Sequence, residues 1–243
     1  MSAANDLIDI ADMLGAAGSA EAGWLASRRA AERLGFAAVN AAGIFSGTGE
    51  IAWVRHGMRA GWVEAYCGQR MHEVDPAVAW AVSDRMEGRF SAADVRSAPA
   101  GRRADEMADL LEDHAYRHLL CRKWAEGSVT KAVLLCTEAP PELSLRPETL
   151  AILPAVSAMM AVRIGAPQDC AGALGVEYRH LSGRERDVLG FLAAGLDNQQ
   201  IAERLGLAEV TVRMHMAKAR RKMGAATREQ ALALAMARGM LAL

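Results

Sequence analysis

Leu181-Ser-Gly-Arg-Glu185 is the first of three stretches that decide the fold of this chain; the others are Ala194-Gly-Leu-Asp-Asn-Gln-Gln-Ile-Ala202 and Glu209-Val-Thr-Val-Arg-Met-His-Met216. Each stretch begins a short helix, and a fourth helix begins at Thr227. Gly195 supplies the left-handed backbone that ends many helices, and the few residues after it allow only a sharp turn. Short helices with tight turns, the third one basic, are how a small domain places a helix in the major groove of DNA. The sequence therefore predicts a helix-turn-helix domain in a regulator of transcription.

The starts of these helices carry matching cap residues. In a capping box, a Ser, Thr or Asp stands three residues before a Glu or Gln, and the two side chains satisfy each other's amide donors. The sequence contains three such pairs: Ser182 with Glu185, Asp197 with Gln200, and Thr227 with Gln230. We therefore expect a reciprocal box at each of these helix starts.

The third helix separates into two faces when about 100° is allowed per residue. One narrow apolar stripe predicts a core-facing seam; it consists of Val212, Met216, Ala219 and Met223. On the opposite side Arg221 is placed to read a guanine edge, while Thr211 and Lys222 are placed to hold phosphates. The alternative interpretation is that these cations only form a solvated helix face. The residues predicted to contact DNA are Asn198, Thr211, Arg213, Met214, Ala217, Lys218, Arg221 and Lys222.

The charge is distributed unevenly along the chain. Residues 178–243 hold 11 Lys+Arg against 6 Asp+Glu, a net charge of +5. The whole chain holds 28 against 29, which leaves 17 against 23, or −6, for residues 1–177. A basic part joined to an acidic one is expected when only one domain meets phosphate. Double-stranded DNA is therefore the expected partner of the C-terminal part.

The C-terminal part is similar throughout to the LuxR-type helix-turn-helix family. The resemblance rests on Leu181, Ser182, Arg184, Glu185, Val188, Leu189, Gly195, Asn198, Ile201, Ala202, Leu205, Thr211, Val212, His215, Lys222, Met223 and Ala231. It implies a homodimer on a palindromic site, with a dimer contact on the last helix through the apolar face of Ala231, Leu234, Ala235 and Met236; the alternative is that this face belongs to the core of its own domain. Ala208 departs from the pattern, since the family usually has a capping Ser or Thr there. Losing that cap costs about 1 kcal/mol, which Glu209 at the positive end of the helix dipole offsets in part.

Length and composition bound the rest of the chain. Its 243 residues suit two domains, and 52% hydrophobic residues suffice for a buried core. No apolar run is long enough to span a bilayer, and the acidic N-terminus lacks the positive flank of a secretory signal. The four cysteines, Cys67, Cys121, Cys136 and Cys170, form no C-x-x-C pair. We therefore expect reduced thiols in a cytoplasmic protein without contact to a membrane.

The domain boundary is expected where Gly, Pro and Ala mix without periodicity, in 165–175. We assign 1–165 to a sensor domain, 166–177 to a linker and 178–243 to the DNA-binding domain. Within the first domain, helices are predicted at 6–14, 21–34, 60–70, 104–118 and 147–164, and strands at 37–45, 51–55 and 131–136. Helices that bracket strands predict an α/β/α sandwich, which commonly holds a small ligand between sheet and helices. The chain as a whole is thus predicted to be an α+β protein with a C-terminal all-α, four-helix domain.

A candidate ligand site lies in the first domain. Trp62 and Tyr66 are four residues apart and share a helix face, and Asp75-Pro76 follows. On spacing alone, the aromatic pair is more typical of a core, and Asp before Pro of a turn. However, the motif resembles the autoinducer-binding domain of LuxR-type receptors. By that resemblance the ligand is an acyl-homoserine lactone: Trp62 donates to its lactone carbonyl, Tyr66 donates to its acyl carbonyl, and Asp75 accepts from its amide.

The sequence departs from this family at two places. Phe90 stands where the family commonly has a second Trp, so we count it as a fourth ligand-binding residue. The stretch 116–124 lacks the expected Gly and Pro and carries Arg122 and Lys123. The alternative is therefore an orphan that acts without ligand, either alone or by forming a heterodimer that titrates another LuxR-type regulator. We expect no cofactor, no metal at His114 and His118, and no enzyme, because no third metal ligand and no G-x-S-x-G motif is present.

Overall fold

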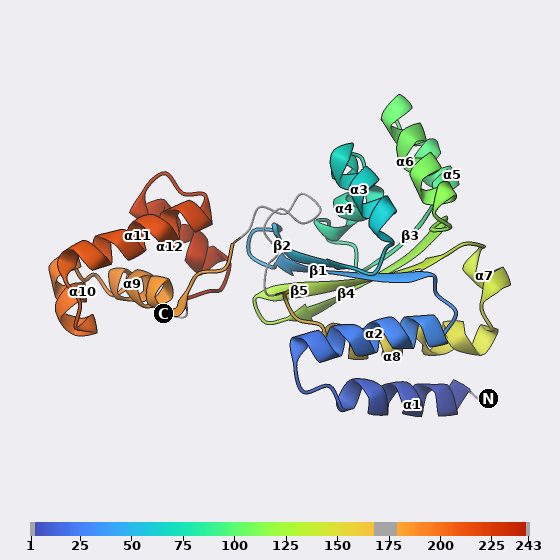
Figure 1. The fold of residues 1–243 in the computed structure, drawn as a ribbon, viewed down its shortest axis with the longest axis horizontal. Helices are drawn as coiled ribbons and strands as arrows, with labels where there is room; N and C mark the ends of the chain where they lie inside the picture. The colour runs from blue at the N-terminus through green and yellow to red at the C-terminus, as the bar shows by residue number, and fades with distance from the viewer. Residues whose placement is uncertain (1–2, 168–178, 242–243) are drawn as a thin grey trace.

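A five-stranded antiparallel sheet organises the N-terminal part of the chain (Figure 1). The computed structural model describes residues 3–167 and 179–241. The strand order is β2-β1-β5-β4-β3. The strands are β1 (Ala38–Phe45), β2 (Ile51–His56), β3 (Glu87–Ser91), β4 (His118–Glu126) and β5 (Val129–Thr137). Neighbours along the chain pair as hairpins at β1–β2 and β4–β5, and β1 pairs with β5 at the centre.

Helices cover both faces of this sheet (Figure 1). On one face lie α1 (Ala3–Gly15), α2 (Ala20–Arg33) and α8 (Pro147–Arg163). On the other lie α3 (Ala60–Gly68), α4 (Pro76–Ala81), α5 (Ala92–Arg96) and α6 (Arg102–Asp113), with the 3-10 turn η1 (Met71–Glu73) leading into α4. The short α7 (Pro141–Ser144) precedes α8. The predicted α/β/α sandwich is therefore confirmed.

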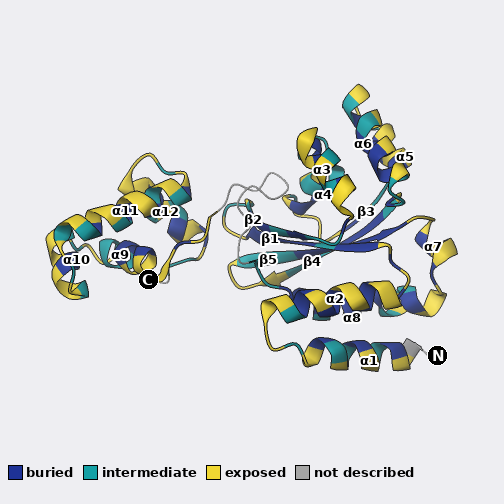
Figure 2. Cartoon of the chain, viewed as in Figure 1, coloured by how far each residue is buried: buried dark blue, intermediate teal, exposed yellow. Residues whose placement is uncertain are grey.

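Two apolar cores fill the sandwich, one on each side of the sheet. Figure 2 shows that the strands between them consist largely of buried residues. On β1, Val39 and Ala41 belong to the core under α2 and α8, while Ala42 and Ile44 belong to the core under α3 and α4. This is the period of two expected of a strand that is buried on both faces. The position of Gly43 requires a glycine, because the Trp53 ring of the paired strand fills the space beside it. A Cβ at Gly43 would stand 2.2 Å from Trp53 Nε1.

Two strands were not predicted from the sequence. The helix expected to continue to His118 ends at Asp113, because Ala115 takes a left-handed backbone (φ 63°) that a helix cannot continue. His118 instead begins β4, so His114 and His118 do not share a helix face. β4 was missed because Arg122 and Lys123 interrupt its apolar run, and β3 because it is only five residues long.

The C-terminal part is the predicted four-helix module. Its helices are α9 (Gly183–Ala193), α10 (Asn198–Leu205), α11 (Glu209–Met223) and α12 (Arg228–Ala237). The capping boxes of Ser182 and Asp197 are both formed. The third box was predicted wrongly: Thr227 accepts from the Gln230 amide, but the Gln230 side chain accepts from the Ala226 amide instead of returning to Thr227.

The core of this module uses the predicted seam of α11. Val212, Met216, Ala219 and Met223 are all buried. Ala231 and Ala235 of α12 are fully buried in the same core. The apolar face predicted as a dimer contact is therefore mainly internal, because the small alanines let α12 pack closely on its own module. Met236, with 39% of its surface exposed, remains outside this core.

The sequence also led to expectations about the linker, the cysteines and membrane-spanning helices. Of the predicted linker 166–177, all but Ala166 and Pro167 lies outside the described residues, as does Cys170. Cys67, Cys121 and Cys136 are free thiols. Among residues 3–167 and 179–241, no helix is long and apolar enough to cross a membrane.

Candidate functional site

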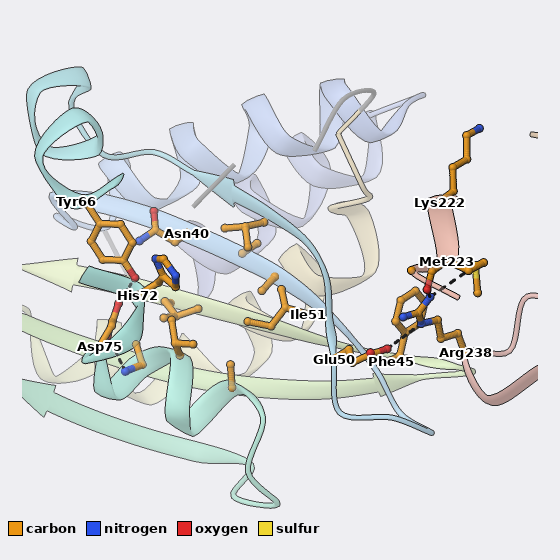
Figure 3. Close-up of a pocket in the computed structure, with 18 of the residues that line it drawn as sticks. Asn40, Phe45, Glu50, Ile51, Tyr66, His72, Asp75, Lys222, Met223 and Arg238 are labelled. Atoms are coloured by element: carbon orange, nitrogen blue, oxygen red, sulfur yellow. Dashed lines mark hydrogen bonds and ion pairs between the residues drawn. The ribbon is translucent and has the colours of Figure 1, made fainter. Parts of the chain in front are cut away.

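A cavity of about 770 Å³ runs from the space between the sheet, α3 and α4 to the C-terminal module, where residues of α11 and α12 also line it (Figure 3). Trp62 and Tyr66 of α3 line it, together with Asp75 at the start of α4. The sheet contributes Asn40, Ala42, Ile51, Val54 and Leu134, and α4 contributes Ala77, Val78 and Ala81. The volume falls in the range of small-molecule sites, which are mostly apolar with a few placed polar groups. The structure thus brings three of the four predicted ligand residues to one cavity.

Asp75 is positioned by two bonds. Its Oδ1 accepts from the Ala77 amide at 2.8 Å, which makes Asp75 the N-cap of α4. Its Oδ2 accepts from the Tyr66 hydroxyl at 2.8 Å (Figure 3). The single proton of the Tyr66 hydroxyl is therefore used by Asp75. A ligand carbonyl would have to compete with Asp75 for it.

The surroundings of this pair change its acid–base properties. Burial raises the pKa of the Asp75 carboxyl, and the hydrogen bonds from Tyr66 and Ala77 offset only part of that effect. Burial, and then the charge of Asp75, raise the pKa of the Tyr66 hydroxyl far above its ordinary value. Tyr66 therefore remains a donor across the accessible pH range, whereas Asp75 can take up a proton more readily than an exposed aspartate.

Trp62 offers a donor that no described residue uses. Its Nε1 is buried and has no hydrogen-bond partner within 3–167 and 179–241. Its ring stacks on Tyr66 with centroids 4.5 Å apart and meets the edge of Tyr116 at 6.2 Å. The Tyr116 hydroxyl in turn accepts from the Arg59 amide, the N-cap position of α3, at 3.0 Å. An unpaired buried donor costs free energy unless a ligand or water satisfies it.

Phe90 and Lys123 lie away from this cavity. Phe90, on β3, lines a second and smaller hollow with His118 and Pro141. The Lys123 ammonium lies beneath the end of α4, where it donates to the carbonyls of Trp80 and Ala81 at 3.2 Å each. Lys123 therefore closes the C-terminal end of a helix whose dipole favours a cation there. The charged side chain that departs from the family pattern does not enter the cavity.

Sequence reasoning missed the sheet side of the cavity. Asn40, on β1, uses its side-chain oxygen to accept from the Gly57 amide at 3.1 Å. His72, in η1, also lines the cavity. An available signal was Asn40 in an otherwise apolar strand, because a polar side chain inside a buried strand requires a partner.

The outer face of α11 forms the candidate nucleic-acid interface. Val210 and Met214 are exposed by 72% and 44%, and Arg221 and Lys218 are exposed as well. Arg213 pairs with Glu209 one turn earlier at 2.6 Å. A hollow between α10, α11 and α12 brings Asn198 together with Arg213 and Ala217. Small or flexible residues at the centre of this face, with cations around them, would allow the helix to enter a groove of DNA.

Lys222 has a partner inside the module. Its Nζ lies 2.8 Å from Oε2 of Glu185, whose side chain is 4% exposed. The same carboxylate caps α9 by accepting from the Ser182 amide at 2.7 Å. Burial alone would raise the pKa of the Glu185 carboxyl. The hydrogen bonds from Lys222 and Ser182 outweigh burial and hold this pKa below its ordinary value. Lys222 therefore ties α11 to α9 as well as lying near the basic face.

Two families of known proteins match this chain, one in each of its two parts. Residues 179–235 match the family described as bacterial regulatory proteins, luxR family, and residues 19–121 match the autoinducer binding domain family. A 47-residue segment is 43% identical to the transcriptional regulatory protein MctR of Rhizobium johnstonii, covering 19% of this chain and 22% of that protein. The match to MctR thus spans less than a quarter of the relative.

Solved structures share the fold. SdiA in complex with octanoyl-rac-glycerol matches with a TM-score of 0.56 and 16% identity, over 98% of this chain and 94% of that one. CepR2 of Burkholderia cenocepacia, an N-acylhomoserine lactone dependent factor, matches with a TM-score of 0.50 and 17% identity, over 66% and 92%. The two family matches define the class: a transcriptional regulator that joins an autoinducer-binding domain to a DNA-binding one. The chain belongs to the LuxR family and carries an autoinducer-binding domain.

Proposed function

We propose that this protein is a ligand-responsive regulator that binds a palindromic operator as a homodimer. Its ligand is an acyl-homoserine lactone or a similar small molecule with an acyl chain. In this proposal 1–165 is the sensor domain, 166–177 the linker and 178–243 the DNA-binding domain. The observation that carries the proposal is the buried, unpaired indole N–H of Trp62, whose side chain lines the same cavity as Asp75.

The cavity supplies groups that match an amide-bearing acyl ligand. Trp62 donates to a ligand carbonyl, and Asp75 accepts from the ligand amide. Tyr66 holds Asp75 in place through the 2.8 Å hydrogen bond. To donate to the ligand, the Tyr66 hydroxyl must first break this bond to Asp75. The apolar wall of Ile51, Val54 and Leu134 suits an acyl chain. Acyl compounds also appear in the descriptions of two similar structures: SdiA is in complex with octanoyl-rac-glycerol, and CepR2 is N-acylhomoserine lactone dependent.

The basic module supplies DNA contacts of two kinds. Exposed Arg221 is proposed to read a base edge, and Thr211 and Lys218 are proposed to hold phosphates. Asn198, Arg213, Met214, Ala217 and Lys222 complete the proposed interface. In a homodimer, two such helices reach half-sites about one DNA turn apart.

One observation favours the ligand-independent alternative. The Tyr66 and Asp75 side chains satisfy each other without a ligand, so this part of the cavity is already hydrogen-bonded. A protein of that kind would act alone or form a heterodimer with another LuxR-type regulator.

Thermal unfolding with a panel of acyl-homoserine lactones separates the two functions. Because a ligand that binds only the folded state stabilises it by mass action, the midpoint should rise with concentration for at least one acyl length. Decanoic acid, which has the chain but lacks amide and lactone, is the control. No rise with any lactone, together with operator binding that is unchanged by lactone, would establish the ligand-independent alternative.

A further inference from the structure

A hollow of about 390 Å³ lies on one flank of α11, where the starts of α10 and α12 meet it. Arg213 and Arg220 line this hollow from α11, Asn198 is the first residue of α10, and Arg228 is the first residue of α12. At about 100° per residue, the flank with Arg213 and Arg220 lies roughly a quarter turn from Arg221. The hollow therefore borders the outer face that is proposed to enter the DNA groove.

Positive charge gathers around this hollow. Three guanidinium groups line it, those of Arg213, Arg220 and Arg228. Among the residues that the structure describes, Glu229 supplies the one carboxylate in its wall. Like charges that converge repel one another unless an anion lies among them. The start of α12 adds the partial positive charge of a helix N-terminus. Both features favour an anion in the hollow.

Arg220 retains a donor that no described residue uses. Its Nη2 donates to the Ala226 carbonyl, which holds the guanidinium at the turn between α11 and α12. Its Nε is buried and has no hydrogen-bond partner within 3–167 and 179–241. An unpaired buried donor costs free energy until an acceptor reaches it. Arg220 is thus fixed at the hollow with a donor still to be satisfied.

The other two arginines are paired only with partly or fully exposed carboxylates. Arg213 pairs with Glu209 at 2.6 Å, and Arg228 pairs with Glu229 at 2.7 Å. Exposed ion pairs are weak, because water competes for both groups. A phosphate accepts two parallel hydrogen bonds from a guanidinium and matches its planar fork. Both side chains can therefore exchange these carboxylates for a phosphate.

We propose that this hollow binds one phosphate of the DNA backbone, at the rim of the groove that α11 enters. The inference rests on the proposed function and adds Arg220 and Arg228 to its DNA contacts. A helix in the major groove lies between two phosphate backbones, and the flank with the hollow faces one of them. Arg213 and Arg228 donate to the phosphate oxygens, and the Asn198 amide donates from the start of α10. The contact holds α11 at one depth and direction without reading the base sequence.

The test measures the affinity of the full chain for a mixed-sequence DNA duplex by fluorescence anisotropy at a series of salt concentrations. This probe suffices because a phosphate contact does not depend on base sequence. Arg228→Ala removes one cation from the hollow, and the side chain it replaces is 49% exposed, so the module should stay folded by circular dichroism. The slope of log affinity against log salt should become shallower by about 0.9 for each protomer on the duplex. Arg228→Lys retains the cation and should retain the wild-type slope.

Arg184→Ala is the matched control. Arg184 belongs to the same module, is 55% exposed, pairs with a nearby carboxylate, that of Asp187, and is not among the residues of the hollow. Both alanine variants remove one positive charge, so an effect of net charge alone would be equal in the two, whereas we expect the control to keep the wild-type slope.

Two results would overturn the phosphate site while leaving the proposed function in place. One is the same salt slope in Arg228→Ala and Arg184→Ala, with wild type binding the duplex. The other is a slope in Arg228→Lys as shallow as that of Arg228→Ala, which would show an effect of structure and not of charge. If wild type shows no salt-dependent binding to duplex DNA, the proposed DNA binding is wrong and the phosphate site fails with it.

Discussion

Arg238 and Glu50 join the two halves of the chain: the guanidinium of the last helix region donates at 2.7 Å to a carboxylate at the tip of the β1–β2 hairpin. The Arg238 side chain is 9% exposed and that of Glu50 is 47% exposed. The hydrogen bond from Arg238 holds the pKa of Glu50 below its ordinary value. The pairing is therefore present at neutral pH, and it is lost as the pH falls through that lowered pKa.

Removing this pair should loosen the two domains rather than unfold them. Glu50→Gln keeps the size of the side chain and removes its charge, and partly exposed pairs contribute only about 0–1 kcal/mol. We expect a larger radius of gyration by small-angle X-ray scattering, with little change in the thermal midpoint. Glu142→Gln, which breaks the exposed pair with Arg89 inside the sensor domain, is the control. Identical scattering from both variants would show that the pair does not hold the domains together.

Ligand affinity should depend on pH through Asp75. The ionised carboxylate is the better acceptor for a ligand amide, and burial raises the pKa of Asp75 above its ordinary 3.8. Affinity should therefore be highest above the raised pKa and fall as the pH is lowered through it, at a higher pH than for an exposed aspartate. In Asp75→Asn the affinity should be lower and this pH dependence absent. An unchanged pH profile in Asp75→Asn would assign the titration to another group.

Local sequence patterns predicted the module better than the cavity. The seam of Val212 and Met216 and the caps at Ser182 and Asp197 depend on residues three or four apart, so helical periodicity reveals them. The cavity joins residues from β1, α3 and β5 that are far apart in sequence, so spacing alone favoured a core and a turn for Trp62, Tyr66 and Asp75, and only the family resemblance marked them as ligand residues. Phe90 was assigned to the ligand site because of the family resemblance, but it lies on β3 and lines the second, smaller hollow instead.

Arg221 and Lys222 should respond differently to alanine. Arg221→Ala alters an exposed side chain, so DNA affinity should fall by about 1–3 kcal/mol with relaxed sequence preference and unchanged stability. Lys222→Ala also leaves the buried Glu185 carboxylate without its cation, which should cost about 1–3 kcal/mol of folding free energy. Urea unfolding and operator titration at matched salt measure the two effects. The groove assignment is wrong if Arg221→Ala binds the operator as tightly and as selectively as wild type.

Met236 tests the proposed dimer on the last helix. Ala235→Glu places a charge in a fully buried position and should unfold the module. Met236→Glu changes a side chain that is 39% exposed, so the variant should fold but dimerise more weakly. Analytical ultracentrifugation of the full chain, with circular dichroism as the folding control, distinguishes these outcomes. A folded Met236→Glu protein with the dimer affinity of wild type would place the interface elsewhere.

The central claim is that Trp62 and Asp75 bind the polar head of an acyl ligand, and direct titration of N-octanoyl-homoserine lactone tests it most closely. Wild type should bind, and Asp75→Ala should lose about 1.5–3 kcal/mol, roughly 10–150-fold in affinity, because the ligand amide is left unpaired. Trp62→Phe keeps an aromatic ring but removes the indole donor, so its affinity should fall, and circular dichroism checks that the smaller buried side chain leaves the domain folded. Equal affinity for wild type and both folded variants would contradict the account.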